Sequence, residues 1–262
     1  MKLKIITSLL MAAIMTTTIF AEENDSEITK DTVNLLNIAT TQIMLSQRLA
    51  KDYLYMGNRV ALSKATRQLK KSLEMTDDIQ KKLLDSINDE EIRNLLSFVE
   101  MSSEEFKEVS TEDYSLDNAQ LILDLSESML EGSEYVVSTL KEIMNINESN
   151  MIVLSARQSV LAQRIAKYYI AYQSGIKDEN TIVQMKEAVK TFTESHDILM
   201  KNTTNTPELN RKLNDINRLW KIVYKFYLNI EKGGLPLIVF NTTDKITKKM
   251  NKITTLYVEL YK

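Results

Sequence analysis

The chain has 262 residues, with 33 basic and 36 acidic side chains and a formal net charge of −3. The two signs are interspersed, so no basic stripe supports binding to nucleic acid. The absence of cysteine excludes disulfides, thiol catalysis and thiolate metal sites. Only 5 glycines and 2 prolines interrupt the chain, which predicts an all-α protein of long helices joined by short turns.

Residues 1–21 have the order of a secretory signal peptide. Lys2 and Lys4 precede an uncharged, apolar or hydroxylic run, and Ala21 offers a small residue at a cleavage point before an acidic segment. The alternative is a retained membrane anchor. That run is rich in threonine and shorter than the about 20 consistently apolar residues of a spanning helix. We therefore predict a cleaved signal peptide and a mature protein in the periplasm.

An internal repeat organises the remaining sequence. The segment Met44-Leu-Ser-Gln-Arg-Leu-Ala-Lys-Asp-Tyr-Leu54 aligns with Val160-Leu-Ala-Gln-Arg-Ile-Ala-Lys-Tyr-Tyr-Ile170, and six of the eleven positions are identical. Each copy has a normal size for one domain. We predict copy one over residues 28–146 and copy two over residues 150–262.

Each copy is predicted to form an up-down bundle of four helices, so that two tandem bundles follow the signal peptide. Thr206 and Pro207 mark a helix start, Ser115 caps another, and Gly233-Gly234 forms a loop. At residues 145–150 the chain either breaks, with Ser149 as a cap, or continues as a helix that stacks the bundles end to end. The expected helices are 28–56, 59–86, 88–110, 115–146, 150–174, 178–201, 207–230 and 236–260.

The first helix of each copy carries an apolar stripe with three- and four-residue spacing, typical of a helix packed in a bundle. In copy one the stripe consists of Leu35, Ile38, Gln42, Leu45, Leu49 and Met56, with Asp52 as a break. Gln42 and Gln158 occupy equivalent places on the two stripes. Because burying an unpaired amide costs about 1–3 kcal/mol, each glutamine either fixes helix register or contacts a ligand.

Charged and hydroxylic side chains flank the stripes. Arg48 and Arg164 lie beside them, and Ser46 lies on the other side in copy one. A guanidinium next to a buried amide suits a small planar anion, because arginine presents a rigid fork of donors. The alternative is that each arginine pairs with an acidic neighbour. Lys51 and Lys167, one turn further, are expected to be solvated.

The repeated segment resembles the first-helix signature of the PilJ/NarX-type periplasmic sensor domain, the N-terminal domain of type IV pili methyl-accepting chemotaxis transducers. That signature is close to Asn-x-Ala-Gly-Arg-Gln-Arg-Met-Leu-Ser-Gln-Arg-Met-Ala-Lys. Copy one matches it at Asn37, Ala39, Gln42, Met44, Leu45, Ser46, Gln47, Arg48, Ala50 and Lys51. Copy two matches it at Arg157, Gln158, Leu161, Gln163, Arg164, Ala166 and Lys167.

The resemblance implies a four-helix sensor domain in both copies. In relatives that detect nitrate or nitrite, the anion lies between two first helices related by a twofold axis, against an arginine. Ile43 and Ser159 occupy that position here, so the resemblance does not assign nitrate as the ligand. Thr40 and Ala156 replace the family glycine, and Arg157 aligns with a second family arginine where copy one has Thr41.

These observations give a set of candidate ligand-binding residues. A pseudo-symmetric site forms if the two first helices meet within one chain, whereas end-to-end bundles exclude it within a monomer. The set consists of Gln42, Ser46, Arg48, Arg157, Gln158 and Arg164.

No enzyme motif appears, and with His196 as the single histidine we expect no triad, no histidine metal cluster and no cofactor. We predict a non-enzymatic sensory module that binds a small metabolite or anion. It would act through a membrane-bound chemoreceptor or histidine kinase, as a monomer or homodimer. This function predicts a cavity lined by Gln42, Arg48, Gln158 and Arg164. The alternative, a cell-envelope scaffold or interaction protein without a ligand, predicts a dry seam with both arginines facing solvent or acids.

Overall fold

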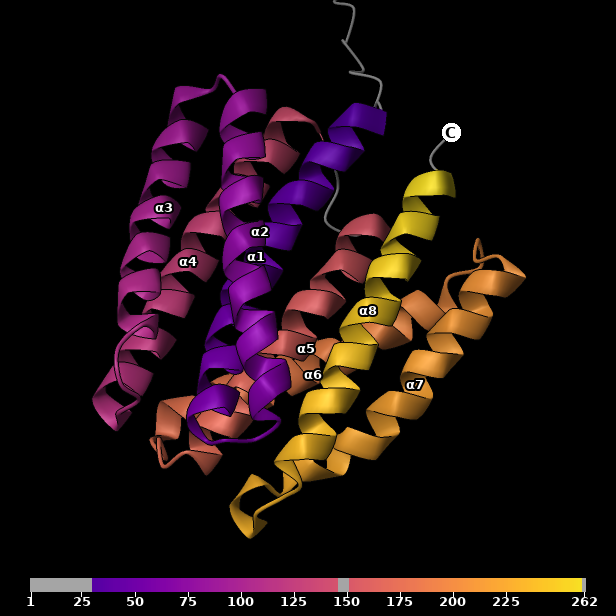
Figure 1. The fold of residues 1–262 in the computed structure, drawn as a ribbon. Coiled ribbons are helices and arrows are strands. Elements are labelled where there is room, and N and C mark those ends of the chain that lie inside the picture. The colour runs from indigo at the N-terminus through magenta and orange to yellow at the C-terminus, as the bar shows by residue number, and fades with distance from the viewer. Residues whose placement is uncertain (1–29, 146–150, 261–262) are drawn as a thin grey trace, which may run out of the picture.

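A computed structural model of the protein describes residues 30–145 and 151–260, and within these ranges all regular secondary structure is helical (Figure 1). This confirms the all-α prediction. The predicted signal peptide and the Ser149 cap lie outside the described residues. The helices are α1 (Lys30–Gly57), α2 (Leu62–Ser86), α3 (Glu90–Ser110), α4 (Leu116–Ile143), α5 (Met151–Gln173), α6 (Glu179–Lys201), α7 (Pro207–Leu228), the 3₁₀ helix η1 (Ile230–Lys232) and α8 (Pro236–Leu260).

Side-chain caps fix where several helices begin. Ser115 accepts a hydrogen bond from the backbone N–H of Asn118, and Thr206 accepts one from that of Leu209, so both predicted caps are confirmed. Each cap satisfies a backbone donor that has no partner within the helix. Pro207 follows Thr206 at the first helical position, where its missing N–H costs nothing.

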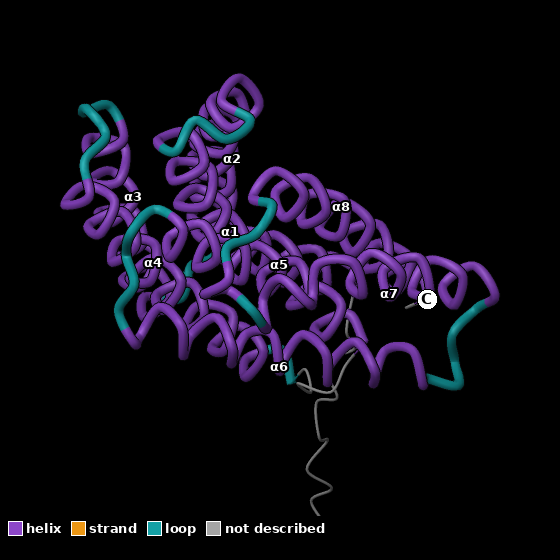
Figure 2. Tube along the Cα trace, turned by 90° about the horizontal axis from the view of Figure 1, so that it is seen from below, coloured by secondary structure: helices purple, strands orange, loops and turns teal. Residues whose placement is uncertain are grey.

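The two repeat copies lie side by side (Figures 1 and 2). In the first, α1 packs against α2 and α4, and α3 packs against α4; in the second, α5 packs against α6 and α8, and α7 packs against both of these. Helices α1 and α5 contact each other and run parallel. Asn58 donates a hydrogen bond to Ser174, its equivalent 116 residues later, and further along the two helices Thr40 and Ala156 line the same small pocket.

This central position buries α1 and α5 on nearly all sides. Besides the predicted stripe, α1 buries Ile43, Met44, Ala50 and Tyr53. A single apolar stripe is expected on a helix that packs against one core, whereas a helix surrounded by neighbours buries side chains on every face. The apolar clusters of the first copy accordingly include residues of the second. These are Val160, Ile170, Ala171, Ile176 and Phe240.

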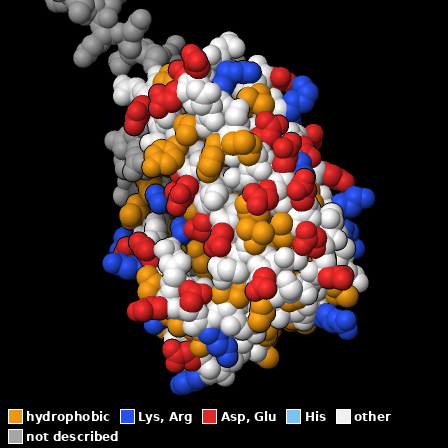
Figure 3. Space-filling model, turned by 90° about the vertical axis from the view of Figure 1, so that its left-hand side faces the viewer, with side chains coloured by type: hydrophobic (Ala, Val, Ile, Leu, Met, Phe, Trp, Pro, Cys, Tyr) orange, Lys and Arg blue, Asp and Glu red, His pale blue; other side chains and the backbone are white. Residues whose placement is uncertain are grey.

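The surface mixes charged and apolar side chains. The face on the α3 side carries acidic groups between separate apolar patches (Figure 3). None of the helices described for residues 30–145 and 151–260 is both long enough and apolar enough to cross a membrane.

Candidate functional site

The two stripe glutamines are fully buried and bond to neighbouring helices of their own copy. Gln42 Nε2 donates to Gln80 Oε1 on α2 at 2.7 Å, and Gln80 Nε2 donates onward to the Leu96 carbonyl on α3 at 2.8 Å. Gln158 Nε2 donates to the Phe192 carbonyl on α6 at 3.2 Å. These bonds tie each first helix to a fixed level of its neighbours, as the register interpretation requires.

The predicted arginines face acidic partners. Arg48 Nε lies 3.6 Å from Asp52 Oδ2, one turn away on α1. Arg164 Nη2 lies 2.8 Å from Glu127 Oε2 on α4 and donates to Gln184 on α6 at the same distance. Ser46 is also occupied, because its hydroxyl donates to the Ile43 carbonyl at 2.8 Å.

The lysines of the repeated segment are buried, so the expectation that they are solvated was wrong. Lys51 Nζ lies 2.8 Å from Asp244 Oδ1 on α8, and Lys167 Nζ pairs with Glu127 on α4; both lysines have no exposed surface. A buried ammonium needs a charged or hydrogen-bonding partner, and each lysine finds one on the last helix of the other copy. The repeated lysine therefore makes two reciprocal contacts between the copies, from α1 to α8 and from α5 to α4.

The buried charges shift each other's proton affinities. Burial raises the pKa of Asp52 to about 6, although Lys51 and Arg48 oppose the shift. Burial also acts to raise the pKa of Asp244, but Lys51 and Lys64 outweigh it and lower that pKa to about 2. In the other cluster, burial lowers the pKa of Lys167 to about 8 against the opposing charge of Glu127. Charge pairing thus keeps Asp244 ionised, while burial brings the pKa of Asp52 close to neutral pH.

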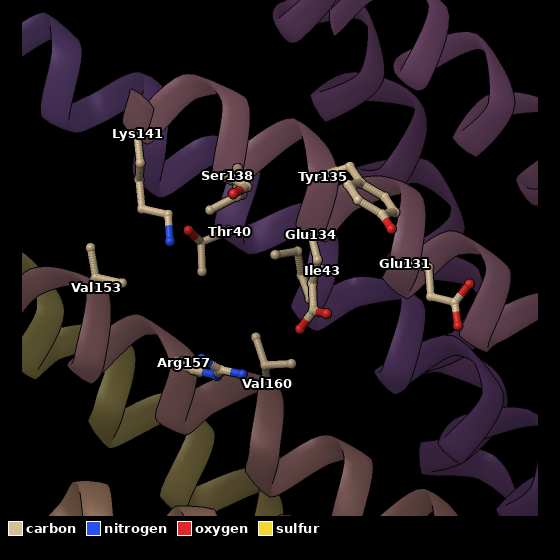
Figure 4. Close-up of a pocket in the computed structure, with 11 residues that line it drawn as sticks. Thr40, Ile43, Glu131, Glu134, Tyr135, Ser138, Lys141, Val153, Arg157 and Val160 are labelled. Atoms are coloured by element: carbon tan, nitrogen blue, oxygen red, sulfur yellow. The ribbon is translucent and has the colours of Figure 1, made fainter. Parts of the chain in front are cut away.

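A groove of about 530 Å³ opens where α1, α4 and α5 meet (Figure 4). Arg157 is the member of the predicted set that lines it; the other five members do not, so the structure does not bring the six together. Arg157 is exposed, and among the described residues it has no hydrogen-bond or ion-pair partner. The lining consists of Thr40, Ile43, Glu131, Glu134, Tyr135, Val137, Ser138, Lys141, Val153, Arg157 and Val160.

Helix α4 supplies groove residues that the sequence analysis missed. Glu131, Glu134, Ser138 and Lys141 recur at spacings of three and four, which places them on one face of the helix. Figure 4 shows Glu134 and Lys141 pointing from α4 into the space opposite Arg157. The sequence signal for these residues was their polar spacing along one helix face. The same spacing is found on any solvated helix face, so it points to a groove only once the position of α5 is known.

A smaller pocket of about 110 Å³ lies on the opposite side of the seam, between α1, α5 and α8. Thr41 lines it at the place equivalent to Arg157, and its lining residues carry no formal charge. Ser159 donates to Asn251 Oδ1 at 2.6 Å. The pocket is lined by Asn37, Thr40, Thr41, Met44, Ala156, Ser159, Asn251, Thr254 and Thr255.

His196, the single histidine, lies in the core of the second copy. It stacks on Phe192 on the same helix, and burial lowers its pKa to about 4, so the ring is neutral near pH 7. Within residues 30–145 and 151–260 no three acidic or histidine side chains are grouped so that they could hold a metal ion.

Comparison of the chain with protein-family models, with curated proteins and with solved structures finds no match.

Proposed function

We propose that the protein is a sensory binding module, built from two tandem four-helix domains of the PilJ/NarX type, that holds a small molecule in the groove between α1, α4 and α5. The observation that carries this proposal is Arg157, an exposed guanidinium without a partner among the described residues, at the edge of a groove of about 530 Å³. Small-molecule sites commonly enclose about 300–1,000 Å³.

The chemistry of the groove suits a ligand with an anionic group. Arg157 offers planar, fixed donors for a carboxylate or a similar anion. Ile43 and Val160 are buried in the groove floor, where they offer an apolar surface to the rest of the ligand. Because the groove draws residues from both copies, a bound ligand contacts α1 and α5 together and favours one arrangement of the two.

The wider role is proposed on the same basis. The signal-like residues 1–21 would direct the protein to the periplasm, where the ligand-bound form would be recognised by a membrane-bound chemoreceptor or histidine kinase. Neither an enzymatic step nor a cofactor is part of this proposal.

A thermal-shift screen of the purified protein against nitrate, phosphate, small carboxylates and amino acids tests the proposal. A ligand at 100 times its dissociation constant should stabilise the folded state by about 2.7 kcal/mol. The shift should disappear in Arg157→Ala and persist in Arg67→Ala, which removes an exposed arginine of α2 outside the groove. A flat response across the panel would count against a sensory function.

The second candidate function is a helical scaffold or interaction protein of the cell envelope that takes no small ligand. The ion pairs of Arg48 with Asp52 and of Arg164 with Glu127 favour it, because a scaffold predicts arginines that face acids. In this case the ligand panel would give no thermal shift with either the wild-type protein or Arg157→Ala.

A further inference from the structure

The groove at Arg157 carries charges of both signs on facing walls. Arg157 extends from α5, while Glu134 and Lys141 point from α4 into the same space, with Glu131 at one end (Figure 4). The two basic and two acidic side chains cancel in formal charge. A simple anion would be attracted by Arg157 but repelled by the carboxylates. A simple cation would be attracted by the carboxylates but repelled by the basic groups.

Arg157 and Glu134 do not neutralise each other. Among the described residues, neither Arg157 nor Glu134 forms a hydrogen bond or an ion pair within 4 Å. A direct ion pair between them would close the groove, whereas their separation leaves room for a molecule that offers each charge a partner. This molecule needs one anionic and one cationic group.

The third property of the groove is its apolar floor. Ile43, Val137 and Val160 are buried side chains that line it between the charged walls. An apolar substituent placed on this floor loses contact with water, which favours binding. Two opposite charges on one side of a ligand and a branched apolar group on the other describe an apolar α-amino acid.

From this arrangement we infer that the ligand is an amphipathic zwitterion of the α-amino-acid class. Its carboxylate lies at Arg157, its ammonium at Glu134 and its side chain on the floor of Ile43 and Val160. The inference rests on the proposed function and narrows its ligand class. It also sets the stoichiometry at one per chain, because Thr41 replaces Arg157 in the uncharged pocket across the seam.

Calorimetric titration with matched ligands tests this inference. Valine, leucine, isoleucine and methionine are titrated first, followed by 4-methylpentanoate, which lacks the ammonium of leucine, and isopentylamine, which lacks its carboxylate. We expect at least one amino acid to bind at one molecule per chain. Removing either charge from leucine should weaken binding about tenfold or more, which corresponds to at least about 1.4 kcal/mol.

Two charge-neutralising variants locate the site. Arg157→Gln should weaken the binding of both the amino acid and 4-methylpentanoate, whereas Glu134→Gln should weaken only that of the amino acid. Both residues are exposed, so the fold should persist, which far-UV circular dichroism checks. Arg67→Gln and Glu90→Gln, exposed positions outside the groove, serve as controls.

The outcomes separate the two proposals. If 4-methylpentanoate binds as tightly as leucine and depends on Arg157, the zwitterion inference fails while the sensory function stands. Binding that is unaffected in both groove variants, or two molecules per chain, overturns the assigned site. If none of the amino acids binds at millimolar concentration, the inference is wrong, and the wider screen decides the function separately.

Discussion

The contact between Lys51 and α8 gives a direct test of how the two copies are held together. In Lys51→Met the side chain keeps most of its length and its apolar character but loses its ammonium. That ammonium lies 2.8 Å from Asp244 and 3.1 Å from Asp52, and Lys51 has no exposed surface. Its removal leaves two buried carboxylates facing one another with less compensating charge.

The expected loss follows from what remains at the site. Removing one partner of a buried ion pair typically costs about 3–5 kcal/mol. Lys64 stays 2.7 Å from Asp244, so we expect the lower end, about 3 kcal/mol. For a chain of this size the melting temperature should fall by about 6–12 °C.

Urea unfolding and calorimetry of Lys51→Met, with the exposed Lys70→Met as the control, measure this effect. The deficit should shrink below pH 6, because Asp52 already has a pKa of about 6 and takes up a proton more readily without Lys51. A loss under about 1 kcal/mol, or a deficit independent of pH, would refute the proposed charge burial.

Three further substitutions test other parts of the structure. The pKa of Asp52 is raised from 3.8 to about 6, so its contribution to stability is present below pH 3.8 and is lost as pH rises through 6. The stability of Asp52→Asn relative to wild type should therefore rise by about 2 kcal/mol between pH 4 and pH 7 in urea unfolding; an unchanged difference would contradict this. Gly132→Ala would place a Cβ atom 2.7 Å from Val99 Cγ2 and should lower stability by about 1–3 kcal/mol in thermal unfolding, despite the better helix propensity of alanine; equal stability would show that α3 and α4 are further apart. Gln42→Leu should cost about 1–3 kcal/mol in urea unfolding because Gln80 loses its donor, and Gln42→Leu with Gln80→Leu should recover most of that loss; a neutral single variant would argue against the buried amide pair.

The sequence predicted the helices well because their ends are encoded locally. Ser115, Thr206 and Pro207 are cap signals that act within one turn, and the predicted bounds differ from the observed ones by a few residues. The packing of α1 was less accessible. A stripe starting at Leu35 suggested one buried face, but contact with α5 buries the opposite side as well, including Ile43.

The site was harder to predict because its residues are distant in sequence. Lys51 was expected to be solvated, but its carboxylate partner Asp244 lies 193 residues away, beyond any local pattern. The groove has the same origin. Glu134 and Arg157 stand on different helices, and only the side-by-side packing of the two copies places them on facing walls.

The repeated segment is better explained by packing than by ligand contact. In both copies its glutamine bonds to the last helix of its own half, Gln47 to the Ser126 carbonyl and Gln163 to Thr247. Its lysine bonds to the last helix of the other half. Because these contacts are reciprocal, they require the same residue types in both copies, whereas one ligand site would require those residue types in only one copy. Arg157 aligns with Thr41 of the first copy and takes no part in these paired contacts. It is therefore where we expect ligand selectivity, because a change there leaves the contacts between the two copies intact.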